Sequence, residues 1–407
     1  MRNLSLFVLL CAFIFSPEHI YSQDVEEYIY GKITTHSGEE YIGFMRWGKE
    51  EVFWHDIFNS EKVDDKHYKF KKEDTGGSRW MNFDWNWSSL WDDKYSHVRH
   101  SFACFFGDIK SIHPGKDSRV DLELKDGTII KLKGGSNDIG GKIKMTDYEL
   151  GQITFDWSKI ERIDFNQASS RVEQAYAPSL YGTVHTRRNG SFKGYIKWDL
   201  DERTTDDILD GDSSIGDQKI PFRNISSITK EENGAFVKMN SGREIFLKGS
   251  NDVNSSSRGI AVYSHEIGSV EISWRDFISA QFEEAPASGP GYNDFPEPEG
   301  LSATVTTFNN NSYEGMLVFD VDELFEIEFL DGKDDLIEYQ IPLRNIHRII
   351  PKNRSFSLVE LRNGEKLLLG DTQDVSSKND GVLIFEKSKK DPHYIAWDDI
   401  DMIQIHH

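Results

Sequence analysis

Apolar and polar residues alternate along most of this chain. Val120, Leu122 and Leu124 form one such series, and Ile130 and Leu132 form the next after a short polar break. A period of two turns one face of a strand toward a core and the other toward water, whereas helices repeat about every 3.6 residues. No stretch sustains the helical period. The pattern therefore predicts an all-β protein of short strands.

Turn residues separate these apolar series. A residue followed by glycine supplies the positive φ angles that tight hairpins require. Such pairs stand at Asp126-Gly127, Ser241-Gly242 and Asn363-Gly364, and the same role falls to Gly38, Gly190 and Asn311 in the preceding stretches. We therefore expect the strands to pair as antiparallel hairpins.

Two sequence motifs alternate, and each occurs three times. The first reads "YGKITTHSGEEYIGFMRWGKEE", "YGTVHTRRNGSFKGYIKWDLDE" and "SATVTTFNNNSYEGMLVFDVDE", and the second begins at Val120, Ala235 and Ser357. Two sets of residues mark the register of the second motif, namely Asp138, Asp252 and Asp374, and Trp157, Trp274 and Trp397. Recurrence of this kind predicts three tandem repeats, each with a first and a second half.

Linkers mark the limits of the repeats. The segments "NQASSRVEQAYAPS" and "EEAPASGPGYNDFPEPEG" follow the first and the second repeat. We therefore expect repeat 1 at residues 28–166, repeat 2 at 179–283 and repeat 3 at 300–405. Repeat 1 is longer than the others, and its excess lies in a tryptophan-rich insertion at about residues 59–100.

Each half of a repeat offers four or five short strands in roughly 50 residues. A sheet of that size can bury its apolar face by closing into a barrel, which also removes exposed strand edges. The predicted fold is therefore all-β, with three tandem repeats that are each a pair of small five-stranded barrels. A six-bladed propeller and one β-sandwich per repeat are the alternatives.

The first half of each repeat resembles the Sm-like small β-barrel. The resemblance rests on a strand, a glycine turn, a long bent strand, an acidic loop and a closing strand such as "PFRNISSI". Sm-like barrels often assemble in rings on RNA, but the acidic charge of this chain speaks against that partner. The repeats as a whole also resemble an uncharacterised exported bacterial protein family, and that resemblance implies no activity.

Residues 1–22 have the features of a cleaved signal peptide, with Arg2 before an apolar run from Leu4 to Phe15. The run is far shorter than the roughly 20 residues that span a bilayer, so we expect no membrane span. The mature chain is predicted to be exported, either periplasmic or secreted. Its net charge of −22 would repel nucleic acid and anionic lipid.

The recurring residues of the second motif favour structural roles. Asp138, Asp252 and Asp374 could each bind Ca²⁺, but that ion takes 6 to 8 oxygen ligands and each loop offers one aspartate. Aspartate also bonds backbone N–H groups one or two residues further on, so we favour a turn role. The recurring tryptophans are expected to fill a packing seam, with a binding stripe as the minority interpretation.

The insertion carries the most distinctive side chains, which are Trp80, Trp85, Trp87 and Trp91. Clustered aromatic rings suit stacking on a sugar or on a protein partner. The alternative is that the insertion folds back as a lid over its own barrel. We name these four tryptophans as the candidate ligand-binding residues.

A weak metal candidate follows the insertion. His97, His100 and Cys104 could offer two nitrogens and a sulfur to zinc, but no fourth ligand is evident. Cys104 also suits an inward-facing strand position. We found no catalytic or cofactor motif, so no cofactor is predicted.

These observations favour an exported, non-enzymatic binding or scaffolding protein of the cell envelope. The expected partner is an envelope protein or glycan, recognised through the tryptophan-rich insertion. The alternative is an envelope polysaccharide hydrolase that uses carboxylates beside the tryptophans, such as Asp84, Asp92 or Asp93.

Overall fold

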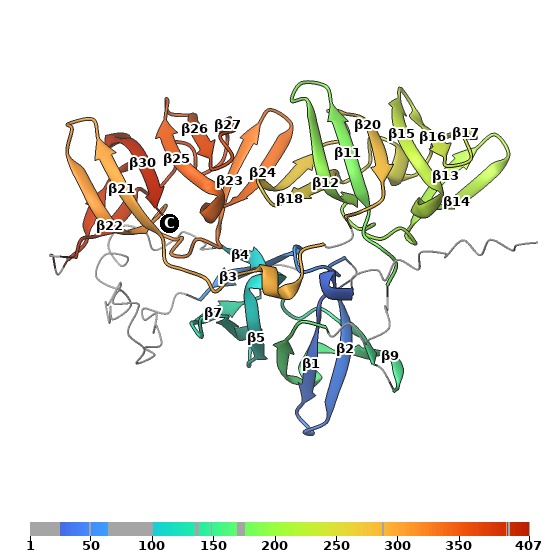
Figure 1. The fold of residues 1–407 in the computed structure, drawn as a ribbon, viewed down its shortest axis with the longest axis horizontal. Coiled ribbons are helices and arrows are strands. Elements are labelled where there is room, and N and C mark those ends of the chain that lie inside the picture. Colours follow the sequence, from blue (N-terminus) through green and yellow to red (C-terminus); the bar gives the residue numbers. More distant parts are fainter. Residues whose placement is uncertain are drawn as a thin grey trace, which may run out of the picture.

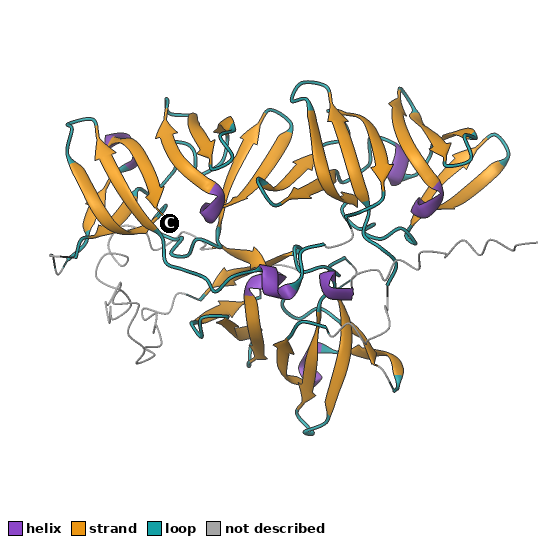
Figure 2. Ribbon diagram, in the orientation of Figure 1, coloured by secondary structure: helices purple, strands orange, loops and turns teal. Residues whose placement is uncertain are grey.

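The computed structural model describes residues 25–48, 50–63, 101–134, 138–147, 149–168, 176–286, 289–387, 389 and 391–406. It is 56% strand and 7% helical, and its sheets are antiparallel, which confirms the all-β prediction (Figure 2). The helical part consists of single 3₁₀ turns such as η2 (Phe106–Asp108) and η5 (Asn251–Val253). None of the described helices is long and apolar enough to cross a bilayer.

Three segments of ten strands follow one another along the chain. Segment 1 contains β1 (Tyr30–Thr35), β2 (Glu40–Trp47), β3 (Ile57–Lys62), β4 (Ser101–Phe105), β5 (Ile109–Pro114), β6 (Arg119–Leu124), β7 (Ile129–Lys133), β8 (Ile143–Asp147), β9 (Gly151–Phe155) and β10 (Ile160–Phe165). Segment 2 contains β11 (Tyr181–Thr186), β12 (Ser191–Trp198), β13 (Ile208–Ser213), β14 (Gly216–Pro221), β15 (Ile225–Glu231), β16 (Gly234–Met239), β17 (Glu244–Leu247), β18 (Ile260–Ser264), β19 (Gly268–Ile272) and β20 (Phe277–Glu283).

Segment 3 contains β21 (Ser302–Thr307), β22 (Ser312–Val318), β23 (Phe329–Asp334), β24 (Ile337–Pro342), β25 (Ile346–Pro351), β26 (Phe356–Leu361), β27 (Lys366–Gly370), β28 (Val382–Phe385), β29 (His393–Ile395) and β30 (Ile400–His406). The glycines expected in the tight turns have positive φ, as at Gly127 (86°) and Gly364 (91°). A glycine in the long second strand lets a neighbouring strand approach, since a Cβ on Gly194 would lie 2.0 Å from the carbonyl oxygen of Tyr263.

Strand pairing follows one order in segments 1 and 3. In segment 1 the pairings run β4-β3-β7-β6-β5-β10-β1-β2-β8-β9, and in segment 3 they run β24-β23-β27-β26-β25-β30-β21-β22-β28-β29. Segment 2 keeps this order from β17 to β19, but its β13–β14 hairpin is a separate sheet, and one isolated bridge joins its Asp212 to Lys248, the residue after β17.

The pairing differs from the predicted division of each repeat into two independent halves. In segment 1 the strands β3 to β7 are consecutive and pair among themselves, but they are inserted between β2 and β8, which pair with each other. None of the sheets formed by the described residues closes into a barrel, so the predicted pairs of small barrels are not confirmed. Alternation shows which face of a strand is buried, but it does not choose the strand's neighbour, which is why the sequence did not reveal this nesting.

Segments 2 and 3 share one 18-stranded sheet. Strand β19 pairs with β24 in an antiparallel ladder from Ser269 opposite Gln340 to Ile272 opposite Ile337. These two segments lie side by side in the upper part of Figure 1, and segment 1 lies below them as a separate sheet.

Segment 1 attaches to the other two through side chains. Phe105 is 1% exposed, and its ring lies 5.3 Å from that of Tyr263, 5.8 Å from that of Phe295 and 5.0 Å from that of Phe329. Full burial of such a ring contributes roughly 1.5–3 kcal/mol, so this aromatic cluster is a main source of the docking energy. The docked arrangement brings polar loops from all three segments together.

Candidate functional site at the junction of the three segments

Most of the site residues expected from the sequence lie outside the described residues. This applies to Trp80, Trp85, Trp87, Trp91, Asp84, Asp92, Asp93, His97 and His100. Cys104 is described, in β4, where its side chain is fully buried and burial raises the pKa of the thiol. Strand β3 has counterparts in β13 and β23, so the additional length of segment 1 lies between β3 and β4.

The recurring aspartates each tie a loop to a strand. One carboxylate oxygen of each residue accepts a backbone N–H at 2.6 Å, in the pairs Asp138 with Asn59, Asp252 with Asp210, and Asp374 with Asp331. These partners lie 79, 42 and 43 residues away, so the side chains fix tertiary structure and not a local bend. Burial raises the pKa of Asp138 and of Asp252 to about 6.

The recurring tryptophans lie in aromatic contacts at the end of the long second strand. Their partners are Trp47 for Trp157, Trp198 for Trp274 and Phe319 for Trp397, with ring centroids 5.8, 6.3 and 6.2 Å apart and the rings edge to face. Such contacts fill the space between the strand and the turn that carries each tryptophan.

A second recurring carboxylate was not predicted from the sequence. Asp56, Asp207 and Glu328 each accept two backbone N–H groups from the residues three and four positions earlier, in the turn before the third strand of their segment. Their other oxygens face cations of a different segment, in the pairs Asp56–Arg203, Asp207–Arg46 and Glu328–Lys62. Because they occupy one position of the repeated motif, an alignment of the three segments would have found them.

One of these ion pairs, Asp56–Arg203, lines a cavity of about 640 Å³. It is lined by residues of all three segments, which are Gly48, Glu50, Glu51, His55, Asp56, Ile57, Asn59 and Asp138 from segment 1, Lys197, Leu200, Arg203, Ala261, Tyr263, Ser269 and Glu271 from segment 2, and Gln340 from segment 3. Its volume is typical of ligand pockets, which measure about 300–1,000 Å³. We call it the junction cavity.

One wall of the junction cavity holds three buried polar side chains, which are the ion pair Asp56–Arg203 and the neighbouring His55. The Arg203 guanidinium donates to the Asp56 carboxylate and lies 3.3 Å from Nε2 of His55. Burial would raise the pKa of Asp56, but Arg203, Lys197 and the backbone N–H of Phe53 act together with His55 to lower it. Burial, reinforced by Arg203, lowers the pKa of His55 to about 3, so this imidazole is neutral at physiological pH. The His55 ring stacks on Tyr263 at 4.6 Å.

The carboxyl groups that line the cavity outnumber its cations. Lys197 Nζ lies 3.5 Å from Glu50 and 3.6 Å from Glu51. Burial nevertheless raises the pKa of Glu51 to about 8. Glu271 stands opposite Glu338 in the β19–β24 ladder, and burial followed by the charge of Glu338 raises its pKa. The cavity therefore has more carboxyl groups than its cations neutralise.

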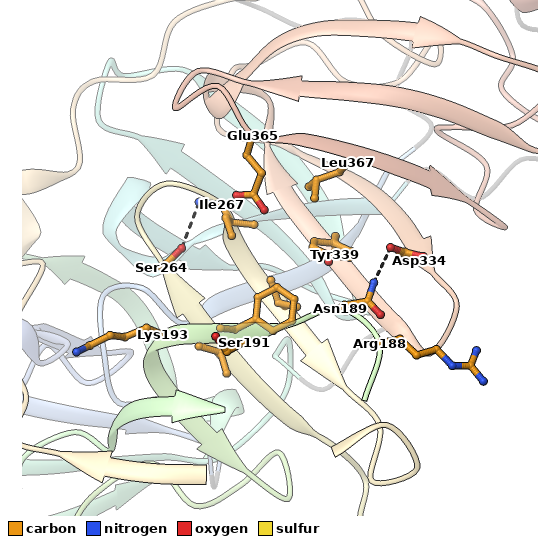
Figure 3. Close-up of a pocket in the computed structure, with 13 residues that line it drawn as sticks. Arg188, Asn189, Ser191, Lys193, Ser264, Ile267, Asp334, Tyr339, Glu365 and Leu367 are labelled. Atoms are coloured by element: carbon orange, nitrogen blue, oxygen red, sulfur yellow. Dashed lines mark hydrogen bonds between the residues drawn. The ribbon is translucent and has the colours of Figure 1, made fainter. Parts of the chain in front are cut away.

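A smaller cavity of about 400 Å³ lies between segments 2 and 3 (Figure 3). Its lining includes Phe192, Val270 and Tyr339, whose side chains are mainly apolar. At its rim Asn189 donates to Asp334 across the two segments. This second cavity has fewer ionisable groups than the junction cavity, and the rim bond joins the segments. The junction cavity is therefore the stronger candidate for a functional site.

The acidic loops, which look like solvated surface in the sequence, are partly buried. Asp199, Asp201 and Glu202 bring their carboxylates within 4.8 Å of one another, the one such group among the described residues. Arg258 pairs with Asp199 at 3.3 Å and with Asp201 at 2.5 Å. The arginine therefore supplies positive charge to this cluster.

No protein-family model matches this chain, and no significant match was found among curated proteins or among solved structures.

Proposed function

We propose that this chain is an exported, non-enzymatic binding or scaffolding protein of the cell envelope, and that it holds a small polar ligand in the junction cavity. The observation that carries the proposal is the composition of that cavity, because its wall takes side chains from all three segments. The cavity is complete only when segment 1 is docked. A ligand that binds the docked state alone would therefore stabilise the assembly by mass action.

Binding fits the cavity better than catalysis does. A general base needs a free, accessible lone pair, but Asp56 is already bonded to Arg203 and to the backbone N–H groups of Val52 and Phe53. His55 is neutral and packed between aromatic rings, at 5.4 Å from Phe53 and 4.6 Å from Tyr263. These groups hold the segments together, which is a scaffolding role.

The repeated order of strands supports the accompanying proposal that the segments are copies of one unit. In this proposal the chain is an array of three such units, with recognition of an envelope protein or glycan by the tryptophan-rich insertion of the first. The insertion and the likeness to Sm-like barrels and to an exported bacterial family stay predictions from the sequence.

A cavity-filling variant tests the proposed function. Ala261 lines the cavity from β18, so Ala261→Phe should occupy the space without removing a charge, and Ala261→Ser is the matched control. Intrinsic fluorescence of the chain from residue 23 would be titrated with envelope glycans and a cell-envelope extract. We expect a saturable change in the wild type and in Ala261→Ser that is lost in Ala261→Phe.

Two results would contradict this proposal. An unchanged titration in Ala261→Phe, with the variant folded, would exclude the cavity as the binding site. A variant without residues 76–95 then shows whether the tryptophan-rich insertion binds instead. Reproducible turnover of an envelope polysaccharide, lost on a single carboxylate substitution, would favour the hydrolase alternative.

A further inference from the structure

We infer that the junction cavity binds a small organic ammonium ion, held by the carboxylates of Glu271, Glu51 and Asp138. This inference rests on the proposed binding function and specifies its ligand. It derives from the charges, the hydrogen-bond partners and the spacing of the groups that line the cavity.

The lining has more carboxyl groups than cations, even when Glu51, with its pKa raised to about 8, is left out of the count. Five carboxyl groups face two cations, with Glu50, Glu51, Asp56, Asp138 and Glu271 on one side and Lys197 and Arg203 on the other. Arg203 is bonded to Asp56, and Lys197 lies between Glu50 and Glu51. Because both cations already face carboxylates, they are poorly placed to hold an anion, and the remaining demand is for positive charge.

Glu271 is a cavity carboxylate whose pKa stays raised by burial and Glu338, although Lys197 and Lys333 lower it in part. It faces Glu338 directly across the β19–β24 ladder, and like charges in that position repel. Glu338 pairs with Lys333, whereas the described residues provide no ion pair for Glu271. Burial raises the pKa of Glu271, as it does for Glu51 and Asp138. An ammonium group in the cavity would relieve this repulsion.

The neutral groups of the lining also suit an ammonium ion. Asn59 and Gln340 carry amide oxygens, and Tyr263 and Ser269 carry hydroxyl oxygens, so each has an acceptor group. An ammonium group donates three hydrogen bonds, which a ring of carboxylate, amide and hydroxyl oxygens can accept. The volume of about 640 Å³ leaves space for a ligand with a carbon framework and more than one amine.

The spacing of the carboxylates disfavours a bare divalent metal. Ca²⁺ and Mg²⁺ need several oxygen ligands that converge on one point. Among the described residues, one acidic group has its possible ligand atoms within 4.8 Å of each other, and it consists of Asp199, Asp201 and Glu202. None of these three residues lines the cavity. The cavity carboxylates are too widely spread for one ion, and this spread suits an extended organic cation.

Calorimetric titration of the chain from residue 23 tests the inference. The probes are 1,4-diaminobutane and glucosamine, each beside its neutral counterpart, 1,4-butanediol and glucose. We expect saturable binding of at least one amine and none of its neutral counterpart, and the two amines distinguish a linear amine from an amino sugar. Binding should release protons at pH 7, because a cation lowers the raised pKa of Glu51.

Two glutamine variants locate the ligand. Glu271→Gln should weaken amine binding by about tenfold or more, since a charge-assisted hydrogen bond is lost. Glu244→Gln is the matched control, because Glu244 is an exposed strand residue of the same segment that does not line the cavity. Its affinity for the amine should equal that of the wild type.

Several outcomes would overturn the inference. Equal binding of the neutral counterpart would exclude ammonium recognition and leave the proposed binding function intact. Displacement of the amine by equimolar Ca²⁺, or equal affinity in Glu271→Gln and wild type, would also contradict it. If neither amine binds, the inference fails, and the separate envelope-extract titration of Ala261→Phe decides whether the cavity binds another ligand.

Discussion

Segments 2 and 3 are joined differently from segment 1 and its neighbours. The first join is a strand ladder, β19 with β24, that makes one continuous sheet. The second join consists of side chains, with an aromatic cluster around Phe105 and buried ion pairs such as Lys62–Glu328 at 2.5 Å. The ladder fixes the register of segments 2 and 3, and the cavity between them measures about 400 Å³, whereas the docked side chains of segment 1 help to enclose the more polar junction cavity of about 640 Å³. The candidate ligand site accordingly lies at the side-chain join.

The largest expected effect comes from breaking a buried ion pair of the side-chain join. Lys62 is bonded to the Asp322 backbone carbonyl at 2.7 Å, to its carboxylate at 3.0 Å and to Glu328 at 2.5 Å. Lys62→Met would leave buried negative charge without its cation and should cost about 3–5 kcal/mol of unfolding free energy. Urea denaturation measures this.

The control for this prediction is the double variant Lys62→Met with Glu328→Gln. The glutamine keeps an oxygen for the backbone N–H groups of Leu324 and Phe325 and removes one uncompensated charge. It should recover part of the lost stability. A single variant as stable as the wild type would mean that this ion pair does not hold segment 1.

A substitution in the apolar core beside the strand ladder tests the other join. Ile337 is fully buried in β24, opposite Ile272. Ile337→Ala should cost about 2–4 kcal/mol through lost burial and a cavity. Limited proteolysis should then separate the two joins, because Lys62→Met releases segment 1 first and Ile337→Ala loosens segments 2 and 3. Identical cleavage patterns in both variants would contradict this distinction.

The pH dependence of stability comes next in size. Burial raises the pKa of Glu51 to about 8 and of Asp138 to about 6, so the folded state holds these protons more tightly than the unfolded state. Their stabilising effect is complete below the unfolded pKa and is lost as the pH rises through the folded pKa. The melting temperature should therefore fall between pH 5 and pH 8.

Calorimetric scans at several pH values check this, with Glu51→Gln as the comparison. The amide cannot ionise, so this variant should show a flatter decline than the wild type. A melting temperature that rises over the same pH range would contradict the prediction, because it would mean that the pKa values of these carboxyl groups are not raised in the folded state.

The smallest effect concerns the like charges in the ladder. The double variant Glu338→Lys with Lys333→Glu places a cation opposite Glu271 and keeps an ion pair across the β23–β24 ladder with its charges exchanged, and a favourable cross-strand pair contributes roughly 0.2–1 kcal/mol. Thermal unfolding should show a slight gain in stability at low salt that disappears at high salt. In the same variant, 1,4-diaminobutane should bind more weakly, because the lysine competes for Glu271.

The sequence predicted local structure better than it predicted the site. Alternation and the turn glycines, such as Gly127, correctly predicted antiparallel strands because both act within a few residues. The nesting of β3 to β7 between β2 and β8 depends on pairing between distant strands, which no local pattern encodes. Asp199 lies in an acidic stretch that looks like solvated surface in the sequence, but its partners Asn251 and Arg258 come from a loop more than 50 residues later.

The junction cavity was beyond prediction for a similar reason. Its lining combines residues as distant as Glu51 and Gln340, which meet only after three segments have docked. The repeated carboxylate at Asp56, Asp207 and Glu328 was visible in principle, because it holds one place in three similar motifs. The predicted ligand-binding tryptophans remain untested, since they lie outside the described residues.

The nested strand order also determines which strands of a segment can pair early in folding and which must pair late. In segment 1, β3 to β7 pair among themselves and can associate early, apart from the long connection between β3 and β4. Strand β1 must wait for β10, whose Phe165 pairs with Gly31 more than 130 residues away. Closing so large a loop costs entropy before any contact compensates for it, which slows folding. Each segment thus stays open until its tenth strand arrives, and chaperones that hold unfolded chains have their longest opportunity to act in that interval.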